Sequence, residues 1–287
     1  MNQDTVNQEP LISIIVAVFN GGKTLQRCID SVAGQTYPHK ELIIMDGGST
    51  DGTVDILRAN NDKIAYWKSE RDRGIYHAWN KALDHVRGDW ICFLGSDDYL
   101  WNEDVLRRLA DQLPDVPSNI RVVYGQVAFV DRHGETICVV GQPWDNVRRQ
   151  YSEYMSIPHP GTLHHRRLFE ERGRFDESFR VAGDYELLLR ELKTGDAFFV
   201  LDLIVAGWQV GGLSCDPLNK VQILREHARA YQKNSVDFNR LVWLWGYAKA
   251  VGHAFLVRLI GLRGVSYVAD FYRLVTGRPV FWTRLNK

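Results

Sequence analysis

The stretch Gly88-Asp89-Trp90-Ile91-Cys92-Phe93-Leu94-Gly95-Ser96-Asp97-Asp98 is a short apolar run that ends in two adjacent carboxylates. Bulky apolar side chains over this length are typical of a buried strand. Because ligands in an open α/β sheet bind beyond the carboxyl ends of the strands, we expect Asp97 and Asp98 at the mouth of a crevice. Two like charges side by side are tolerated where a divalent cation lies between them and a phosphate. The alternative is a helix cap, although Asn102 competes for that role ahead of a helical pattern that starts at Glu103.

Length and charge favour a large α/β domain with an appendage. The chain has 287 residues and no formal net charge, and such a length buries a sizeable core. The charge is unevenly spread, because the segment from residue 240 to the end has eight basic residues and one acidic residue. The tail is therefore basic and the remainder acidic. We expect no nucleic-acid partner, and the oligomeric state is left open.

The cysteine spacing and the N-terminal residues indicate the cellular compartment of the protein. The four cysteines are scattered and form no C-x-x-C pair, which suits a reducing cytosol and argues against a zinc site or a disulfide framework. Residues 1–10 are polar, lack the apolar core of a signal peptide and are expected to be disordered. No run is long and charge-free enough to predict a transmembrane helix. We expect a cytoplasmic protein, either free or peripheral at the inner face of the membrane.

Strand-like and helix-like patterns alternate along the first hundred residues, which predicts a parallel sheet with right-handed crossovers. Later strands suit the antiparallel part of a mixed sheet. After the second strand, Ser49 or Thr50 is placed to cap a helix. No G-x-G-x-x-G follows the first strand and no G-x-x-x-x-G-K-[ST] occurs, so neither a dinucleotide site nor a P-loop is supported. The other expected strands are Leu11–Phe19, Glu41–Met45, Ile64–Trp67, Val122–Val130, Thr136–Val140 and Ala197–Val205.

Several short motifs, in this order, resemble the family 2 glycosyltransferases. Each motif alone is common, but together and in this order they are specific. The resemblance extends from Leu11 to about Ser214 and includes a segment, Gly207–Ser214, that closes over the donor in the family. The motifs are Val16–Asn20, Asp46–Thr53, Asp72–Tyr76 with Asn80 and Lys81, Gly95–Asp98, Phe175–Phe179 and Ala182–Glu186.

The resemblance implies a fold, a reaction and a domain arrangement. It implies a GT-A fold, a Rossmann-like mixed sheet flanked by helices, over residues 11–216. The sequence that follows is itself expected to form a helical, basic and amphipathic extension over residues 217–287. It also implies a nucleotide-sugar donor, a divalent metal (Mn²⁺ or Mg²⁺) and inversion at the anomeric carbon. Asp46 is followed by Gly47, as in members that act in surface-polysaccharide assembly. We therefore expect transfer from a UDP-sugar to a hydroxyl of a lipid-linked or growing cell-surface glycan.

The resemblance also implies site residues, each with a plainer alternative. Many members have Asp where this chain has Gly95, so the metal ligand is Asp97, Asp98 or both. The plainer alternatives are a turn residue for Asp46, a solvated cap for Asp72 and Arg73, a helix face in water for Asn80, and a structural role for His159. The implied nucleotide-sugar-binding residues are Val18, Asn20, Asp46, Asp72, Arg73, Gly74, Asn80, Asp97 and His159.

An inverting transfer needs a base on a different segment from the metal ligands, because the acceptor hydroxyl must lose its proton as it attacks. By motif this carboxylate is Asp184, which also opens a helical pattern. Glu186 is the rival, although on a helix it would point away from Asp184. The alternative is that Asp184 only caps its helix.

The tail has an apolar stripe at helical spacing: Leu241, Trp245, Ala248, Gly252, Phe255 and Leu259. Aromatic and basic residues together are the composition of a helix that lies on an anionic membrane. The alternative is a helix packed on its own catalytic domain or on a partner subunit.

Two other functional classes use a similar sheet. A sugar nucleotidyltransferase would need a glycine-rich loop with a basic residue after the first strand, which Asn20-Gly21-Gly22-Lys23 fits poorly. A non-catalytic nucleotide-sugar or glycan-binding module would not need Asp184 beside a complete donor set. Release of free nucleoside diphosphate, of pyrophosphate or of neither would separate the three classes.

Overall fold

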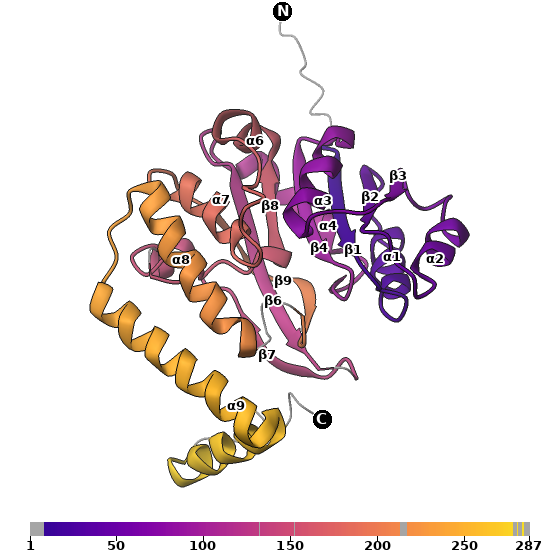
Figure 1. Cartoon of the computed structure of the whole chain (residues 1–287). Coiled ribbons are helices and arrows are strands. Elements are labelled where there is room, and N and C mark those ends of the chain that lie inside the picture. The colour runs from indigo at the N-terminus through magenta and orange to yellow at the C-terminus, as the bar shows by residue number, and fades with distance from the viewer. Residues whose placement is uncertain are drawn as a thin grey trace, which may run out of the picture.

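The computed structural model of the chain describes residues 9–131, 133–151, 153–212, 217–277, 280 and 283 (Figure 1). Of residues 1–10, which we expected to be disordered, residues 1–8 lie outside the described part. The expected α/β class is confirmed, because a mixed sheet is flanked by helices and is followed by two further helices toward the C-terminus.

Nine strands of the described residues form one sheet in the order β3-β2-β1-β4-β8-β6-β9-β5, and β7 pairs with β6. The strands β1 to β4 are parallel, whereas β8 is antiparallel to both β4 and β6. The strands are β1 Ile12–Val18, β2 Lys40–Asp46, β3 Tyr66–Ser69, β4 Trp90–Gly95, β5 Tyr99–Leu100, β6 Val122–Val130, β7 Thr136–Val140, β8 Thr162–His165 and β9 Phe198–Gln209.

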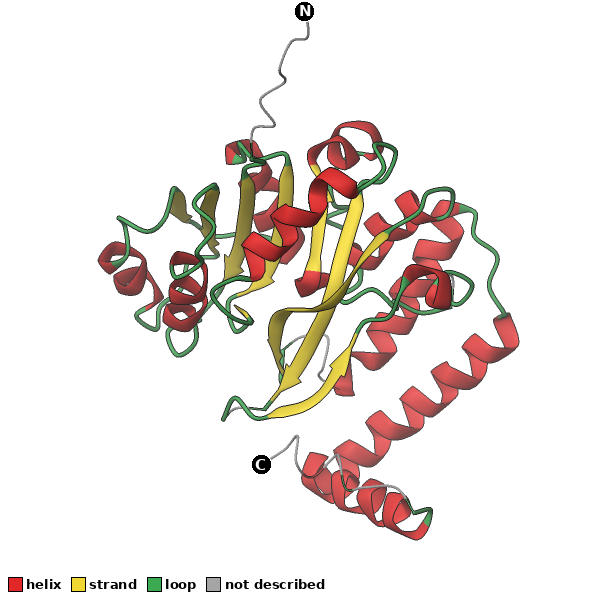
Figure 2. Ribbon diagram, turned by 180° about the vertical axis from the view of Figure 1, so that it is seen from behind, coloured by secondary structure: helices red, strands yellow, loops and turns green. Residues whose placement is uncertain are grey.

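Helices cover both faces of this sheet (Figure 2). The α-helices are α1 Leu25–Ala33, α2 Thr53–Ala59, α3 Ile75–Ala82, α4 Val105–Gln112, α5 Trp144–Val147, α6 Arg166–Arg172, α7 Gly183–Leu192, α8 Lys220–Asn234 and α9 Arg240–Val275. Short 3₁₀ turns lie at Leu83–His85, Leu113–Asp115, His159–Gly161 and Pro217–Asn219.

The continuous apolar run of β1 serves two cores at once. Ile14 and Val16 point into a cluster that α1 and α4 cover, whereas Ile15 points into a second cluster that includes side chains of α3 and α7. Successive strand residues face opposite sides, so a strand buried on both faces shows no polar alternation. The same holds for β4, where Cys92 and Phe93 belong to opposite clusters. The central strands therefore hold their carboxyl ends rigidly at one edge of the sheet.

Most predicted elements form with small changes in their ends. β6 and β7 have the predicted bounds, β3 lies two residues later than predicted, and β9 is longer. The predicted cap of α2 is wrong, because Gly52 is the N-cap residue and the Asp51 carboxylate accepts the Thr53 N–H. Ser49 is not free to cap, since its hydroxyl binds Asp46.

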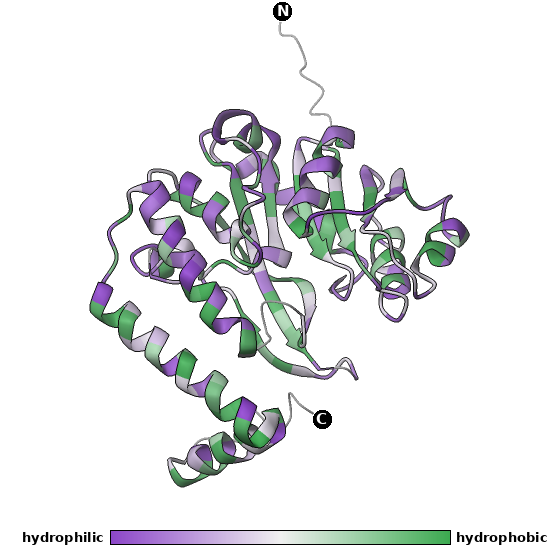
Figure 3. Ribbon diagram, viewed as in Figure 1, coloured by the Kyte–Doolittle hydropathy of each residue, from purple (hydrophilic) through white to green (hydrophobic). Residues whose placement is uncertain are grey.

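The two C-terminal helices differ in how they pack. Ala230 and Tyr231 of α8 lie in the same core cluster as α7, so α8 belongs to the folded body of the domain. α9 packs against α8 and lies outside the layers that cover the sheet, and its backbone breaks from helical geometry at Gly261, where φ is 73° (Figure 1). Hydrophobic residues continue along α9 beyond the globular body (Figure 3).

Candidate active site

The carboxyl ends of the parallel strands align in one row. In the strand register, Val18 of β1 lies beside Asp46 of β2, which lies beside Ser69 of β3, and Ala17 lies beside Gly95 of β4. The loops that follow these strands therefore meet at a single edge, where open α/β sheets bind ligands. This edge includes the Asp46 loop and, after β4, the two adjacent aspartates.

Asp46 organises the loop that follows β2. Its buried carboxylate accepts hydrogen bonds from the Gly48 and Ser49 N–H groups at 3.2 and 3.1 Å. It also accepts hydrogen bonds from the hydroxyls of Ser49 and Ser69, both at 2.5 Å. Four donors to one carboxylate fix the loop, so Asp46 is more than a turn residue.

Asn20 ties the first loop to the Asp46 loop. With φ at 53°, it donates its N–H to Ser49 Oγ at 2.7 Å, and its Oδ1 accepts the Thr50 N–H at 3.0 Å. The Val18 carbonyl accepts the Gly47 N–H at 2.8 Å. Phe19, between these anchors, is 66% exposed. Sequence reasoning assigned no role to Phe19, although an aromatic residue directly after a buried strand was a usable signal.

Gly47 leaves room for Asp72. A Cβ atom at residue 47 would lie 2.7 Å from Asp72 Oδ2, so a larger residue would push that carboxylate away. Asp72 Oδ1 accepts the Gly74 N–H at 2.9 Å, and Gly74 has a φ of 128° at the start of α3. Arg73 pairs with Glu177 at 2.5 Å. Residues 72–74 thus connect the Asp46 loop to α3 and to the Glu177 turn.

Asn80 fastens α3 to the Phe175–Phe179 turn. Its amide donates to the Phe175 carbonyl at 2.9 Å and to Glu177 Oε1 at 3.1 Å, and its Oδ1 accepts the Phe175 N–H at 3.1 Å. Asn80 is buried, so the alternative of a helix face in water is wrong for this residue. Its direct contact with a nucleotide sugar stays a prediction.

The two aspartates after β4 have different surroundings. The buried Asp98 accepts the Gly95 N–H at 3.1 Å and the Gln209 N–H at 3.2 Å, which joins the end of β4 to the end of β9. Burial and then the nearby Asp97 charge raise the pKa of Asp98 to about 8. The Asp97 carboxylate interacts with its own backbone N–H, and burial raises its pKa. Asp98 is therefore the carboxylate that binds the backbone of β4 and β9, so Asp97 is the better candidate to contact a ligand.

Arg27 supports this pair in a way that sequence reasoning missed. Its guanidinium donates to the Asp97 backbone carbonyl at 2.7 Å and to Gln209 Oε1 at 2.5 Å. It also lies over the Tyr99 ring, 4.4 Å from the centroid. No motif pointed to Arg27, because these partners lie 70 and 182 residues away along the chain.

The aspartate pair fits a divalent cation that shares a substrate's phosphates. The described residues contain no group of three or more His, Cys, Asp or Glu that would hold a metal alone. Mg²⁺ and related hard ions commonly use one or two carboxylates plus substrate phosphates. Asp98 is buried and Asp97 is half-buried. Burial first, and then repulsion by the Asp97 charge, raise the pKa of Asp98, and a cation would relieve that repulsion.

Asp184 lies in the first turn of α7, with Ala182 rather than Asp184 as the N-cap residue. Its Oδ1 accepts the Tyr185 N–H at 2.8 Å and the Tyr76 hydroxyl at 3.2 Å. Burial raises the pKa of Asp184 to about 6 against the effect of these donors. A carboxylate that titrates near neutrality suits a general base. Tyr76 belongs to α3, so one helix contacts both the Asp46 side of the site and Asp184.

Glu186 is committed elsewhere. Its side chain is fully buried and pairs with Arg190 at 2.9 Å and Lys233 at 3.2 Å. Asn234 donates to the same carboxylate at 3.2 Å. A carboxylate with these partners is a structural link between α7 and α8, which removes the rival to Asp184.

Glu226 of α8 supports the loop before Asp184. Its buried carboxylate accepts the N–H groups of Arg180, Val181 and Ala182 at 2.8 to 2.9 Å. Burial acts to raise the pKa of Glu226, but the hydrogen bonds, that from Gln222 first, hold the pKa below its ordinary value. This position lies outside the motifs, in the expected extension, so sequence reasoning did not find it.

His159 lies inside an aromatic cluster behind α3. Its ring stacks on Trp79 at 5.2 Å and on Phe93 at 5.7 Å between centroids. Burial lowers the pKa of His159 to about 3, so the ring is neutral at physiological pH. Its Nε2 atom is buried without a partner among the described residues. This location favours the structural alternative, and a direct contact with the donor stays a prediction.

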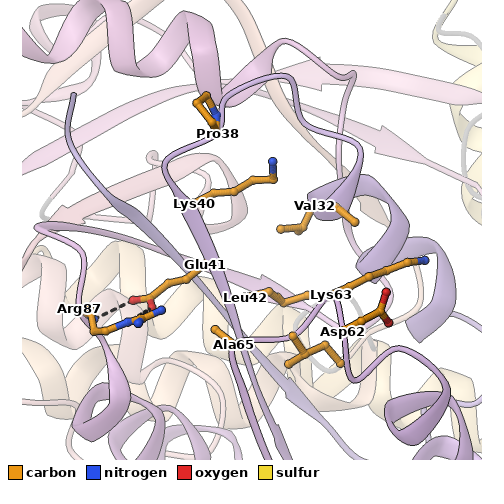
Figure 4. Close-up of a pocket in the computed structure, with 11 residues that line it drawn as sticks. Val32, Pro38, Lys40, Glu41, Leu42, Asp62, Lys63, Ala65 and Arg87 are labelled. Atoms are coloured by element: carbon orange, nitrogen blue, oxygen red, sulfur yellow. Dashed lines mark hydrogen bonds and ion pairs between the residues drawn. The ribbon is translucent and has the colours of Figure 1, made fainter.

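One pocket of the described residues lies away from this edge. It has a volume of about 280 Å³ and is lined by Lys40, Glu41 and Arg87 among others (Figure 4). Lys40 begins β2, whereas Asp46 ends it, so the pocket is at the opposite end of the strand. Arg87 and Glu41 also satisfy each other in an ion pair. The residue chemistry, rather than pocket size, identifies the candidate site.

Comparison with known proteins decides the family. The sequence profile of "Glycosyl transferase family 2" matches residues 13–173, more than half of the chain. The chain belongs to glycosyl transferase family 2. A "PGL/p-HBAD biosynthesis glycosyltransferase" of Mycobacterium tuberculosis is 33% identical over 185 residues, which are 63% of this chain and 69% of the relative. An "uncharacterized glycosyltransferase" of Rickettsia typhi is 27% identical over 212 residues, which are 71% of this chain and 65% of the relative.

Solved structures of glycosyltransferases share the fold. Residues 1–349 of Staphylococcus aureus TarS, in complex with UDP-GlcNAc, match with a TM-score of 0.59 and 18% identity, over 85% of this chain and 72% of that one. The mannosyltransferase PcManGT of Pyrobaculum calidifontis, in complex with GDP-Man and Mn²⁺, matches with a TM-score of 0.64 and 19% identity, over 97% and 84%. The predicted GT-A fold and glycosyltransferase activity with a nucleotide-sugar donor are confirmed. The nucleotidyltransferase and binding-module alternatives are set aside.

Proposed function

We propose that this glycosyltransferase is inverting and metal-dependent, and moves a sugar from a UDP-sugar to a hydroxyl of a lipid-linked or growing cell-surface glycan. One observation carries the proposal: two carboxylates whose pKa is raised by burial, Asp97 and Asp184, lie on separate chain segments, after β4 and at the start of α7. For Asp184 the raised pKa is about 6.

The donor side would use the row of loops at the carboxyl ends of β1, β2 and β4. The exposed Phe19 ring offers a face for a nucleotide base, and Asn20 and Asp46 fix the loops beside it. Asp97, with Asp98 behind it, would hold Mn²⁺ or Mg²⁺. A bound ion would supply Lewis-acid stabilisation of the charge on the departing diphosphate. The UDP-GlcNAc complex of TarS and the GDP-Man and Mn²⁺ complex of PcManGT support this class of donor and cofactor.

The acceptor side would use Asp184. An acceptor hydroxyl attacks the anomeric carbon, the bond to the diphosphate oxygen breaks, and the hydroxyl proton passes to the Asp184 carboxylate. Tyr76 and the Tyr185 N–H hold Asp184 Oδ1 and leave Oδ2 for that proton. A single displacement of this kind inverts the anomeric centre.

The acceptor and the domain limits are proposed on weaker grounds. The names of the mycobacterial relatives place those proteins in PGL/p-HBAD biosynthesis, and they support a glycolipid-type acceptor here. We place the reaction in the cytoplasm. We also propose that residues 11–216 hold the catalytic machinery and that residues 217–287 form a helical extension, of which α8 packs into the catalytic body.

The metal role is tested by nucleotide titration of the purified chain, after a thermal-shift screen of nucleotide sugars has named the donor. Isothermal titration of the matching nucleoside diphosphate, with and without Mn²⁺, should show affinity that depends on the metal. Asp97→Asn should remove most of that dependence, whereas Asp30→Asn, a surface substitution on α1, should not. Unchanged metal-dependent affinity in Asp97→Asn and in the Asp97→Ala/Asp98→Ala protein would reject this metal site.

The base role is tested by turnover. Asp184→Asn should keep the fold and nucleotide binding, because Asn is close to Asp in size, and should lose transfer by about a hundredfold or more. Product stereochemistry, read from the anomeric coupling in NMR, should be opposite to that of the donor. Near-normal transfer by a folded Asp184→Asn protein, or retained stereochemistry, would contradict the mechanism.

A further inference from the structure

The long helix α9 exposes an unusual amount of apolar surface. Of the 20 large hydrophobic side chains that are exposed in the described residues, 15 lie on this helix. Exposed patches of this kind mark surfaces that contact another molecule or a membrane. They are Leu241, Val242, Leu244, Trp245, Val251, Phe255, Leu256, Leu259, Ile260, Tyr267, Val268, Phe271, Tyr272, Leu274 and Val275.

Before Gly261, the apolar stripe that the sequence shows points outward. Trp243 and Tyr247, which lie off the stripe, are the residues that pack on α8: the Trp243 indole donates to the Leu224 carbonyl at 2.9 Å, and Arg225 donates to the Tyr247 hydroxyl at 2.6 Å. Projected at about 100° per residue, the exposed apolar side chains cover about half of the helix circumference. The alternative, a helix packed on its own catalytic domain or on a partner subunit, holds for the side of α9 that contacts α8. It does not account for the stripe, because every member of the stripe is exposed.

After Gly261, the same division continues. Val265, Ser266 and Asp270 form a buried side, and Asp270 accepts hydrogen bonds from the Thr283 N–H and hydroxyl. The aromatic and aliphatic residues from Tyr267 onward lie on the other side and are exposed. The break at Gly261 lets two straight segments each present one apolar side.

The exposed surface of α9 is basic as well as apolar. The helix has five Lys or Arg residues and one acidic residue, Asp270, which is buried. Four of the five are exposed: Arg240, Lys249, Arg258 and Arg263. Lys249 and Arg258 flank the apolar face on opposite sides, and the Lys249 ammonium lies over the Trp245 ring at 4.7 Å. The apolar face therefore has positive charge at its edges and no acidic side chain.

We propose that this face of α9 docks on an anionic lipid bilayer and lies in the plane of its interface. Apolar side chains in the centre with basic side chains at the edges are what such a surface binds. A second copy of the chain would bring the same basic edges together, which disfavours that occupant. No helix among the described residues has the length and apolarity needed to cross a bilayer. The inference goes beyond the proposed reaction, which does not depend on it.

The position of α9 gives docking a consequence for the site. α9 packs on α8, and α8 holds the loop before Asp184 through Glu226. The docked helix would therefore be joined by one intermediate helix to the acceptor side of the site. A lipid-linked acceptor, whose lipid lies in the same bilayer, would then be close to the acceptor side of the site.

Flotation of the whole chain with vesicles tests the proposal without any donor or acceptor. Binding to phosphatidylcholine vesicles with about a third phosphatidylglycerol should be at least about tenfold stronger than binding to pure phosphatidylcholine, and it should weaken at high salt. Phe255→Asp/Leu259→Asp should reduce binding at least about tenfold. The matched control is Leu201→Asp, because Leu201 is 66% exposed, close to the 62% and 63% of the two test residues, but lies on β9.

Charge reversal and solution size complete the test. Lys249→Glu/Arg258→Glu should lose most binding to anionic vesicles, whereas Arg58→Glu on α2 should not. Circular dichroism and thermal melts confirm that each variant is folded. Failure of the intact chain to prefer anionic vesicles overturns the proposal. A second result would also overturn the proposal: the intact chain forms a stable dimer and binds no vesicles, and Phe255→Asp/Leu259→Asp dissociates the dimer. That result would assign this face of α9 to contact with a second copy of the chain. If the intact chain binds anionic vesicles but transfers no sugar, the result would count against the proposed reaction and not against membrane docking.

Discussion

Replacing Tyr76 with Phe tests how the site sets the basicity of Asp184. The substitution removes the hydroxyl that donates to Asp184 Oδ1 at 3.2 Å and keeps the ring, which packs against Gly183 and Phe175. A donor to a carboxylate stabilises its charged form, so the loss of this donor raises the pKa of Asp184. We expect the acidic limb of the pH profile of kcat/KM to move to higher pH.

The size of the shift follows from the contact. A hydrogen bond to a charged group is worth about 1.5 kcal/mol at the lower end of the usual range, and about 1.36 kcal/mol corresponds to one pKa unit. The 3.2 Å distance is long for such a bond, so we expect a shift of about 0.5 to 1 unit. Starting from a pKa of about 6, a full unit would leave about a tenth of Asp184 ionised at pH 6 instead of half. At pH 6 kcat/KM would then fall about fivefold, whereas at pH 8 it would change little.

The assay measures release of nucleoside diphosphate during transfer between pH 5 and 9. Tyr37→Phe is the matched control, because Tyr37 is also buried and its hydroxyl also donates one hydrogen bond, to the Pro10 carbonyl at 2.6 Å, at the start of β1. Its profile should stay that of the natural protein. An acidic limb that stays in place in Tyr76→Phe, or that moves to lower pH, would refute the assignment of Asp184 as the titrating base.

Three further predictions concern stability and binding. Asp184→Asn should raise the free energy of unfolding at pH 7 by about 1–2 kcal/mol, after allowance for partial exposure of the site, and should therefore raise the melting temperature. Folding raises the pKa of Asp184, so its ionisation destabilises the natural protein as the pH rises, and the difference from the variant should vanish below about pH 4. Glu226→Gln should lower the free energy of unfolding, measured in urea, by about 2–3 kcal/mol. The Gln amide has one oxygen that accepts and one NH₂ group that cannot, so it cannot satisfy all three backbone N–H groups. An unchanged urea midpoint would contradict this. Gly47→Ala should weaken nucleotide binding and cost about 1–2 kcal/mol, because its Cβ would displace the Asp72 carboxylate; normal affinity would show that Asp72 can move freely.

The centre of the sheet was predictable because its strands have a simple physical signature. β1, β2 and β4 are buried on both faces, and such strands appear in the sequence as nearly continuous apolar runs. Strand ends were less predictable where pairing decides them. β9 extends from Phe198 to Gln209 because it pairs with β6 over most of its length and with β5 near its end. A strand that depends on partners far along the chain has no local signal for where it stops.

The motifs indicated where the site lies but not which role each of its residues has. Asp97 and Asp98 are adjacent in sequence, but it is Asp98 that accepts the N–H of Gln209, 111 residues later. For Asn80 the sequence left open a sugar-nucleotide contact or a helix face in water, and the structure shows that it holds the Phe175 backbone, 95 residues later. Glu186 was a rival base until its partners on α8 were known. These roles depend on long-range contacts, which a single sequence does not reveal.

The tail shows the limit of periodicity most clearly. Apolar residues at three- and four-residue spacing identify one side of a helix, and in a globular domain that side is normally the buried one. In α9 the rule is reversed: Trp243 and Tyr247, off the stripe, contact α8, while Trp245 and Phe255, on the stripe, face outward. Packing on α8 therefore does not explain why residues on the outer side are apolar. Because burial of apolar surface is the main favourable term in association, that side is expected to be covered when the protein works, and its basic edges favour an anionic bilayer as the cover.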